Sequence, residues 1–175
     1  PGRMMWTKGI QVFVDAARMI RKKHPNLQFI LVGAIPEHGP NKIPVEAIEE
    51  WSQNGWVEWW GWKDDMAEVY RQADIICLPT LYGEGIPKTL IEGAAFQCAL
   101  ISTDSAGCRE IVQDGINGFV VPQNDVPALV NAILKLTQDS ALRIEMGKKG
   151  LEIVKDRFTT ESIAEHSVQI YMQPE

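Results

Sequence analysis

The sequence predicts an α/β domain in which a doubly wound parallel sheet is covered by helices on both faces. Apolar runs of four to seven residues, typical of strands buried on both faces, alternate along the chain with segments of helical periodicity. The 175 residues suffice for one domain with a sizeable core, and the 45% hydrophobic content excludes a disordered chain. We therefore expect residues 1–175 to form a single, Rossmann-like domain.

The first half of the chain is expected to alternate twice between helix and strand. Residues 11–23 place apolar side chains at helical spacing, and Pro25 ends that helix. Residues 27–33 (LQFILVG) are typical of a buried strand that ends at a glycine. A loop rich in proline and glycine then leads to a helix over 44–53, with proline in its first turn, and to a strand over 56–60.

The second half continues the alternation with shorter strands. Asp64 or Asp65 caps a helix that extends to Gln72. The next predicted elements are a strand over 74–79, a helix from about 87 to 97, a strand over 99–103, a short helix over 107–112 and a strand over 119–121. The last third is helical by pattern, at about 125–137, 140–156 and 160–172.

Charge and cysteine content exclude several kinds of partner. Seventeen basic residues against 23 acidic ones give a formal charge of −6, which argues against nucleic-acid binding and against contact with an anionic membrane surface. No apolar run approaches the roughly 18 residues of a membrane span. The three cysteines form no close pair, and Cys77 and Cys98, in or beside apolar runs, are expected to be reduced and buried, which favours a cytoplasmic location.

Candidate ligand-binding residues lie in the segment GEGIPKTLIEGAA, because ligands of open parallel sheets bind beyond the carboxyl ends of the strands. Gly83 and Gly85 allow close backbone approach, and a helix beginning near Pro87 directs free N–H groups to the same place, which favours an anion such as phosphate. Glu84 and Glu92 have seven residues between them and could hold hydroxyl groups on either side of that anion. The alternative is a solvated loop charge and a surface helix residue, since this spacing is common by chance.

A second candidate cluster is basic and precedes the first helix. Arg3 and Lys8 could supply positive charge to a diphosphate, Arg by paired hydrogen bonds and Lys as a point charge. The alternative is an exposed pair near a chain end. No Asp-x-Asp motif is present, so we expect no metal site.

Six segments in order carry a resemblance to a known family: GRMMWTKG at 2–9, FILVG at 29–33, WWGW at 59–62, YRQADIICLP at 70–79, GEGIPKTLIEGAA at 83–95 and GCREIVQDGINGFVVP at 107–122. The series resembles the C-terminal, nucleotide-sugar-binding domain of glycosyltransferase family 4, a retaining group with the GT-B fold. The likeness covers nearly the whole chain and is greatest to the subgroup that builds lipid-linked or surface polysaccharides. It implies that an N-terminal acceptor domain, and a first strand before Arg3, are absent from this chain.

The resemblance also implies roles for individual residues. Arg3 and Lys8 would hold the donor diphosphate, Glu84 would bind hydroxyls of the transferred sugar, and Glu92 would bind the ribose; Arg3, Lys8 and Glu84 are thus the expected catalytic residues. The other residues expected to contact the donor are Gly33, Trp62 beside the base, and Gly85, Ile86, Lys88 and Thr89 at the phosphates.

Two departures from the family pattern affect these assignments. Pro87 stands where many members have glycine, which removes one backbone donor from the phosphate site. Residues 34–36 (AIP) replace a glycine-containing turn, so contacts from that loop are not assigned.

The expected function is therefore metal-independent transfer of a hexose from a nucleotide diphosphate sugar, with no cofactor. UDP is the expected nucleotide, with GDP left open, and the acceptor would be a glycan or a lipid-linked glycan held by the N-terminal domain. The isolated domain is expected to bind nucleotide and to transfer nothing, and the full-length enzyme would be cytoplasmic or peripheral at the inner face of the cell membrane. Two alternatives stay open: a GT-B-type nucleotide-sugar epimerase, and a non-catalytic α/β binding module.

Overall fold

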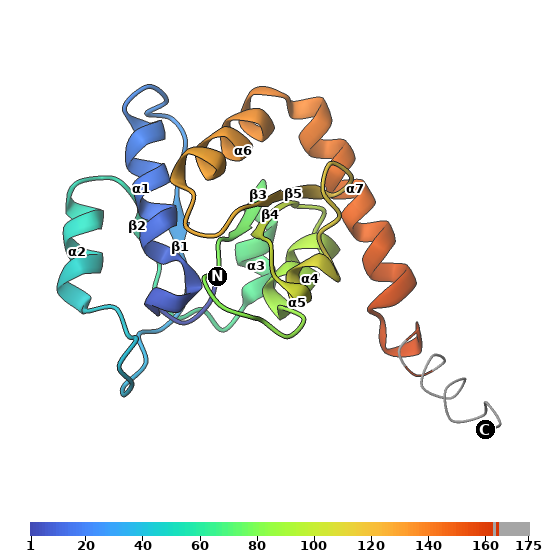
Figure 1. Ribbon diagram of the computed structural model, residues 1–175, viewed down its shortest axis with the longest axis horizontal. Helices are drawn as coiled ribbons and strands as arrows, with labels where there is room; N and C mark the ends of the chain where they lie inside the picture. The colour runs from blue at the N-terminus through green and yellow to red at the C-terminus, as the bar shows by residue number, and fades with distance from the viewer. Residues whose placement is uncertain (163, 165–175) are drawn as a thin grey trace.

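Five short parallel strands form the centre of the domain. In the computed structural model, which describes residues 1–162 and 164, β1 (Ile30–Leu31) pairs with β2 (Glu58–Trp59). A second group holds β3 (Ile75–Leu78), β4 (Ala99–Thr103) and β5 (Gly118–Val121) in that spatial order, again all parallel. The predicted α/β fold with a parallel sheet is confirmed (Figure 1).

Helices cover both faces of these strands. On one face, α1 (Ile10–Arg21) packs against α6 (Val126–Gln138), and α6 contacts β4 and β5. On the other face, α4 (Lys88–Ala95) lies against β3 and β4 and against α7 (Ser140–Arg157), the long helix on the right of Figure 1. The remaining helices are the 3-10 turn η1 (Trp6–Lys8), α2 (Val45–Gln53), which contacts β2, α3 (Met66–Arg71) and the short α5 (Ala106–Arg109).

Strand β4 separates the two hydrophobic cores. Side chains of a strand alternate between its faces, so Ala99 and Ile101 point into the core beneath α1 and α6. Leu100 points into the opposite core, with Leu90 of α4. All five residues of β4 are buried, which is consistent with the apolar run at residues 99–101 followed by the small polar side chains of Ser102 and Thr103.

Most predicted elements are found near their expected bounds, and two strands are shorter than predicted. The strand over 99–103 is confirmed as β4, and Asp65 caps α3 by accepting a hydrogen bond from the Glu68 amide. Ladder pairing in the predicted strands 27–33 and 56–60 covers only two residues of each. Most of the helix predicted over 160–172 lies outside the described residues.

A cavity lies between the two groups of strands, because β1 and β3 do not pair with each other. The cavity measures about 350 Å³ and is lined by β1, β3 and side chains of α1 and α6. At its margin the Gly2 amide donates to the Val32 carbonyl (2.8 Å), and the Met4 amide donates to the Ala34 carbonyl (3.0 Å). Residues 2–4 therefore extend parallel to the chain that leaves β1.

Candidate functional site

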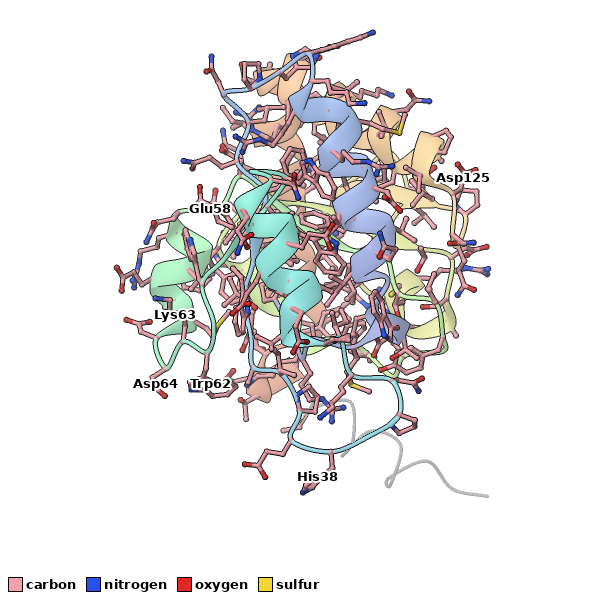
Figure 2. All side chains as sticks on the ribbon, turned by 90° about the vertical axis from the view of Figure 1, so that its left-hand side faces the viewer. His38, Glu58, Trp62, Lys63, Asp64 and Asp125 are labelled. Atoms are coloured by element: carbon pink, nitrogen blue, oxygen red, sulfur yellow. The ribbon has the colours of Figure 1, made fainter. Side chains whose placement is uncertain are left out.

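The candidate residues lie at the carboxyl end of the strands. The loop that follows β1 and the loop between β3 and α4 both project at the lower end of the molecule in Figure 1. The exposed Trp62 and Asp64, which follow β2, lie side by side at this same end in Figure 2, where His38 also projects. Three successive strand-to-helix connections thus meet at one edge, as parallel topology requires.

Lys8 and Glu84 form an ion pair at this edge. Lys8 Nζ lies 2.7 Å from Glu84 Oε1, and both side chains are largely buried. The contact depends on Gly9, which has a left-handed backbone (φ +71°) and approaches Pro79 so closely that a Cβ would lie 1.8 Å from the Pro79 carbonyl oxygen. The Leu81 amide then donates to the Thr7 carbonyl at 2.9 Å, which fixes the loop after β3 against the residues before α1.

Tyr82 completes the surroundings of this ion pair. Its hydroxyl donates to Glu84 Oε2 at 3.2 Å, and its ring lies 5.2 Å from Lys8 Nζ. Burial is the largest single influence on the pKa of Lys8 and would lower it, but the hydrogen bonds and charges of Glu84 and Tyr82 together outweigh burial and raise that pKa above its usual value. Lys8 is therefore a fixed positive charge at neutral pH.

The first turn of α4 presents free N–H groups beside this pair. Pro87 precedes the helix with an extended backbone and offers no side-chain cap. Within the described part of the chain, the amides of residues 83–86 and of Lys88 and Thr89 have no backbone acceptor. Gly107 of α5 supports the loop from behind, since a Cβ there would lie 1.7 Å from the Gly85 carbonyl oxygen. The arrangement favours binding of an anion at the helix start.

Glu92 lies one turn further along α4 and is held by two donors. The Tyr70 hydroxyl donates to Glu92 Oε2 at 2.9 Å, and Lys88 Nζ lies 3.3 Å from Glu92 Oε1. One third of the Glu92 side chain stays exposed, so the carboxylate can still accept hydrogen bonds from a ligand.

The remaining predicted residues surround this group less tightly. Thr89 Oγ1 donates to the Pro1 carbonyl at 3.3 Å, which brings the exposed Arg3 near the start of α4; Arg3 forms no ion pair among the residues that the structure describes. Gly33 (φ +136°) lies where a Cβ would be 1.9 Å from the Gly2 carbonyl oxygen, and its amide donates to the Gly61 carbonyl at 2.7 Å. Trp62, 69% exposed, donates from its indole nitrogen to Asp64 Oδ1 and leaves its ring free.

The structure thus brings together the cation, the two carboxylates and the helix start that the sequence predicted, with Ile86 (49% exposed) on the rim. It adds Tyr70 and Tyr82, which sequence reasoning missed. Tyr82 is only two residues from Glu84 and was open to detection as a neighbouring donor. Tyr70 is 22 residues from Glu92, and no spacing rule connects them.

Residues 1–162 and 164 contain neither a group of metal-binding side chains nor a membrane-spanning helix. No three His, Cys, Asp or Glu side chains there lie close enough together to hold a metal ion. None of the helices there has the length and apolar character needed to cross a membrane.

The sequence of this chain matches a known protein family and several known enzymes. Residues 1–139 match the family model described as "Glycosyl transferases group 1". The chain is 29% identical over 150 residues to an N,N'-diacetylbacillosaminyl-diphospho-undecaprenol α-1,3-N-acetylgalactosaminyltransferase of Campylobacter jejuni, a match that covers 86% of this chain and 38% of the relative. It is 25% identical over 145 residues to a UDP-Gal:α-D-GlcNAc-diphosphoundecaprenol α-1,3-galactosyltransferase of Escherichia coli, covering 82% of this chain and 37% of that enzyme.

A solved structure of a single domain matches most of this chain. The C-terminal domain of the group 1 glycosyl transferase LpcC from Francisella tularensis superposes with a TM-score of 0.78 at 26% identity, covering 91% of this chain and 84% of that one. The chain spans less than half the length of the curated relatives it matches. The matched residues include Lys8, Glu84 and Glu92, so the ion pair and both carboxylates lie inside the region that identifies the family. The chain belongs to the glycosyl transferase group 1 family, as the counterpart of the C-terminal part of its members.

Proposed function

We propose that this domain binds the nucleoside diphosphate of a UDP-sugar and serves a retaining hexosyltransferase that acts on a glycan or lipid-linked acceptor. The observation that carries the proposal is the Lys8–Glu84 ion pair beside the unpaired amides at the start of α4. A charged lysine and free helix amides favour a diphosphate, and carboxylates on either side favour the hydroxyl-bearing groups attached to it.

Glu84 neutralises Lys8 in the ion pair described above. A diphosphate that takes Lys8 as its partner would free part of the Glu84 carboxylate, which is then available to the sugar hydroxyls. Glu84 stays oriented because Tyr82 donates to its second oxygen. The exchange would couple binding of the diphosphate to presentation of the carboxylate.

The proposed chemistry follows from where charge develops. When the bond between the anomeric carbon and the diphosphate oxygen breaks, negative charge grows on the departing nucleotide. Lys8, Arg3 and the first amides of α4 would stabilise that charge without a metal ion, since preorganised cations and N–H groups are effective there. Glu84 would orient the sugar, and Glu92 would contribute binding energy through the ribose. Retention of configuration and metal independence rest on the family resemblance and stay predictions.

The named relatives support the choice of donor and acceptor. The E. coli relative is named for UDP-Gal and for a diphosphoundecaprenol acceptor, and the C. jejuni relative is named for a diphospho-undecaprenol substrate. The E. coli name supports a UDP-sugar here, and both names support a lipid-linked acceptor. We propose that a part of the protein outside these residues binds the acceptor. Membership of a glycosyl transferase family favours transfer over epimerisation and over a non-catalytic module.

The test is a calorimetric titration of the 175-residue chain with UDP, GDP and uridine, in EDTA and in magnesium. We expect saturable UDP binding that is unchanged by EDTA and tighter than uridine binding. Lys8→Ala should weaken UDP binding about tenfold or more and leave uridine binding unchanged, because one charge-assisted hydrogen bond is lost. Lys149→Ala removes an equally charged side chain, paired with Glu152 on α7, and serves as the matched control. Absence of saturable UDP binding would contradict the proposal.

A further inference from the structure

Glu92 depends on one rigid donor among the residues described. Of its two polar neighbours, Lys88 forms an ion pair with Glu92 but is 87% exposed at the end of a flexible side chain, so it constrains Glu92 weakly. Tyr70 is 2% exposed and has no such freedom. The two donors approach opposite oxygens of the carboxylate, and only the tyrosine approaches from the protein interior.

Packing fixes the position of the Tyr70 hydroxyl. The ring stacks on Phe96 with the centroids 5.7 Å apart and the planes 25° apart. The backbone of Tyr70 is held as well, because Cys98 Sγ donates to its carbonyl oxygen at 3.6 Å. Burial, together with the hydrogen bond to Glu92, raises the pKa of Tyr70, so the hydroxyl stays protonated and acts as the donor at neutral pH.

We propose that Tyr70 is a positioning residue for nucleotide recognition: through its hydroxyl it holds the Glu92 carboxylate in the orientation that accepts hydrogen bonds from the ribose hydroxyls of the donor. This inference rests on the proposed function. A carboxylate carries about four acceptor positions, and Tyr70 and Lys88 occupy two of them. One third of the Glu92 side chain is exposed, so the other positions would be available to a nucleotide bound near the start of α4. Preorganisation of this kind improves affinity because the ligand does not have to order the side chain itself.

Tyr70→Phe tests the proposal because it keeps the ring on Phe96 and removes only the hydroxyl. We expect this variant to bind UDP about fivefold to tenfold more weakly, the usual loss for one hydrogen bond. Binding of 2′-deoxy-UDP should change much less. The measured quantity is therefore the ratio of the two dissociation constants, which a general loosening of the fold would leave unchanged because it weakens both ligands alike.

Two comparisons make the result specific. In a Glu92→Ala background, Tyr70→Phe should have no further effect on the ratio, since the two residues act as one unit. Tyr82→Phe removes the same hydroxyl from the neighbour of the other carboxylate, and it should keep the wild-type ratio.

The outcomes separate this proposal from the proposed function. If the wild-type chain fails to bind UDP, the proposed function is wrong. If the wild-type chain binds UDP but Tyr70→Phe keeps the wild-type ratio of the two dissociation constants, Tyr70 does not position Glu92 for the ribose. Equal weakening of UDP and 2′-deoxy-UDP is one such result.

Discussion

The two groups of strands differ in how completely they are built. In the β3–β4–β5 group, β4 has a paired strand on each side and hydrophobic cores on both faces, and all five of its residues are buried. In the β1–β2 group, the ladder is two residues long, and the far edge of β1 faces a cavity instead of a strand. Comparable apolar runs thus give ladders of different length in the two groups.

The same substitution in the two groups should have unequal effects. Leu100 on β4 is fully buried, whereas Leu31 on β1 borders the cavity and is 6% exposed. We expect Leu100→Ala to lower the free energy of unfolding by about 4 kcal/mol and Leu31→Ala by about 2 kcal/mol, since the loss depends on how many packed neighbours each side chain leaves. Urea denaturation measures both, and equal losses would show that the β1 edge is packed as tightly as β4.

The difference between these groups also explains what could be predicted for the fold. The strand over 99–103 was predicted at its observed bounds because burial on both faces leaves an apolar run at its start and only small side chains at its end. Asp65 at the start of α3 was predicted as a cap because the signal is local. The ladders of 27–33 and 56–60 were overestimated, because which residues of a strand meet a partner is a property of the three-dimensional arrangement.

Residues of the candidate site that lie close together in the sequence were easier to predict than contacts between distant residues. The loop glycines, the two glutamates and the helix start lie within one short segment, so their spacing and the family resemblance were enough to group them. The Lys8–Glu84 contact joins residues 76 positions apart, and the resemblance alone suggested that they meet. Tyr70 reaches Glu92 only because α3 packs beside α4, and no pattern within either helix indicates that contact.

The thiols of Cys98 and Cys77 should make the stability of the fold depend on pH. Burial raises the pKa of Cys98, in the core beneath α4, to about 12, and it raises the pKa of Cys77, beside the cavity, to about 12 as well. In the unfolded chain each thiol loses its proton near pH ~8.5, so above that pH the folded state binds more protons than the unfolded state. Stability therefore falls as pH rises from there toward the folded pKa.

The expected slope is about 1.4 kcal/mol per pH unit for each thiol, which amounts to about 2 kcal/mol per thiol at pH 10. Cys98→Ala should remove the contribution of one thiol from the slope measured by denaturation between pH 8 and 10. Cys77→Ala should remove as much if the cavity stays dry. An unchanged slope in Cys77→Ala alone would show that water enters the space between β1 and β3.

An engineered strand is the smallest of the expected effects and the most direct test of the comparison. Because the amides of Gly2 and Met4 pair with the carbonyls of Val32 and Ala34, a segment joined before Pro1 would run parallel to β1 and enter the cavity. Ordering the added residues costs conformational entropy that offsets most of the gain from burying their side chains. We therefore expect a net gain of only about 1 kcal/mol, seen as a rise of a few degrees in melting temperature.

The control for that experiment is an extension of equal length that contains proline at alternate positions, which cannot pair along the edge of β1. The apolar extension should also slow modification of the Cys77 thiol, which borders the cavity, while modification of Cys98 stays unchanged. If both extensions leave the melting temperature and the Cys77 rate unaltered, the cavity is not a strand site. The short β1–β2 ladder would then reflect the local sequence rather than a missing neighbour. A gain confined to the apolar extension would place the difference between the two groups of strands in a single position of the sheet beside β1.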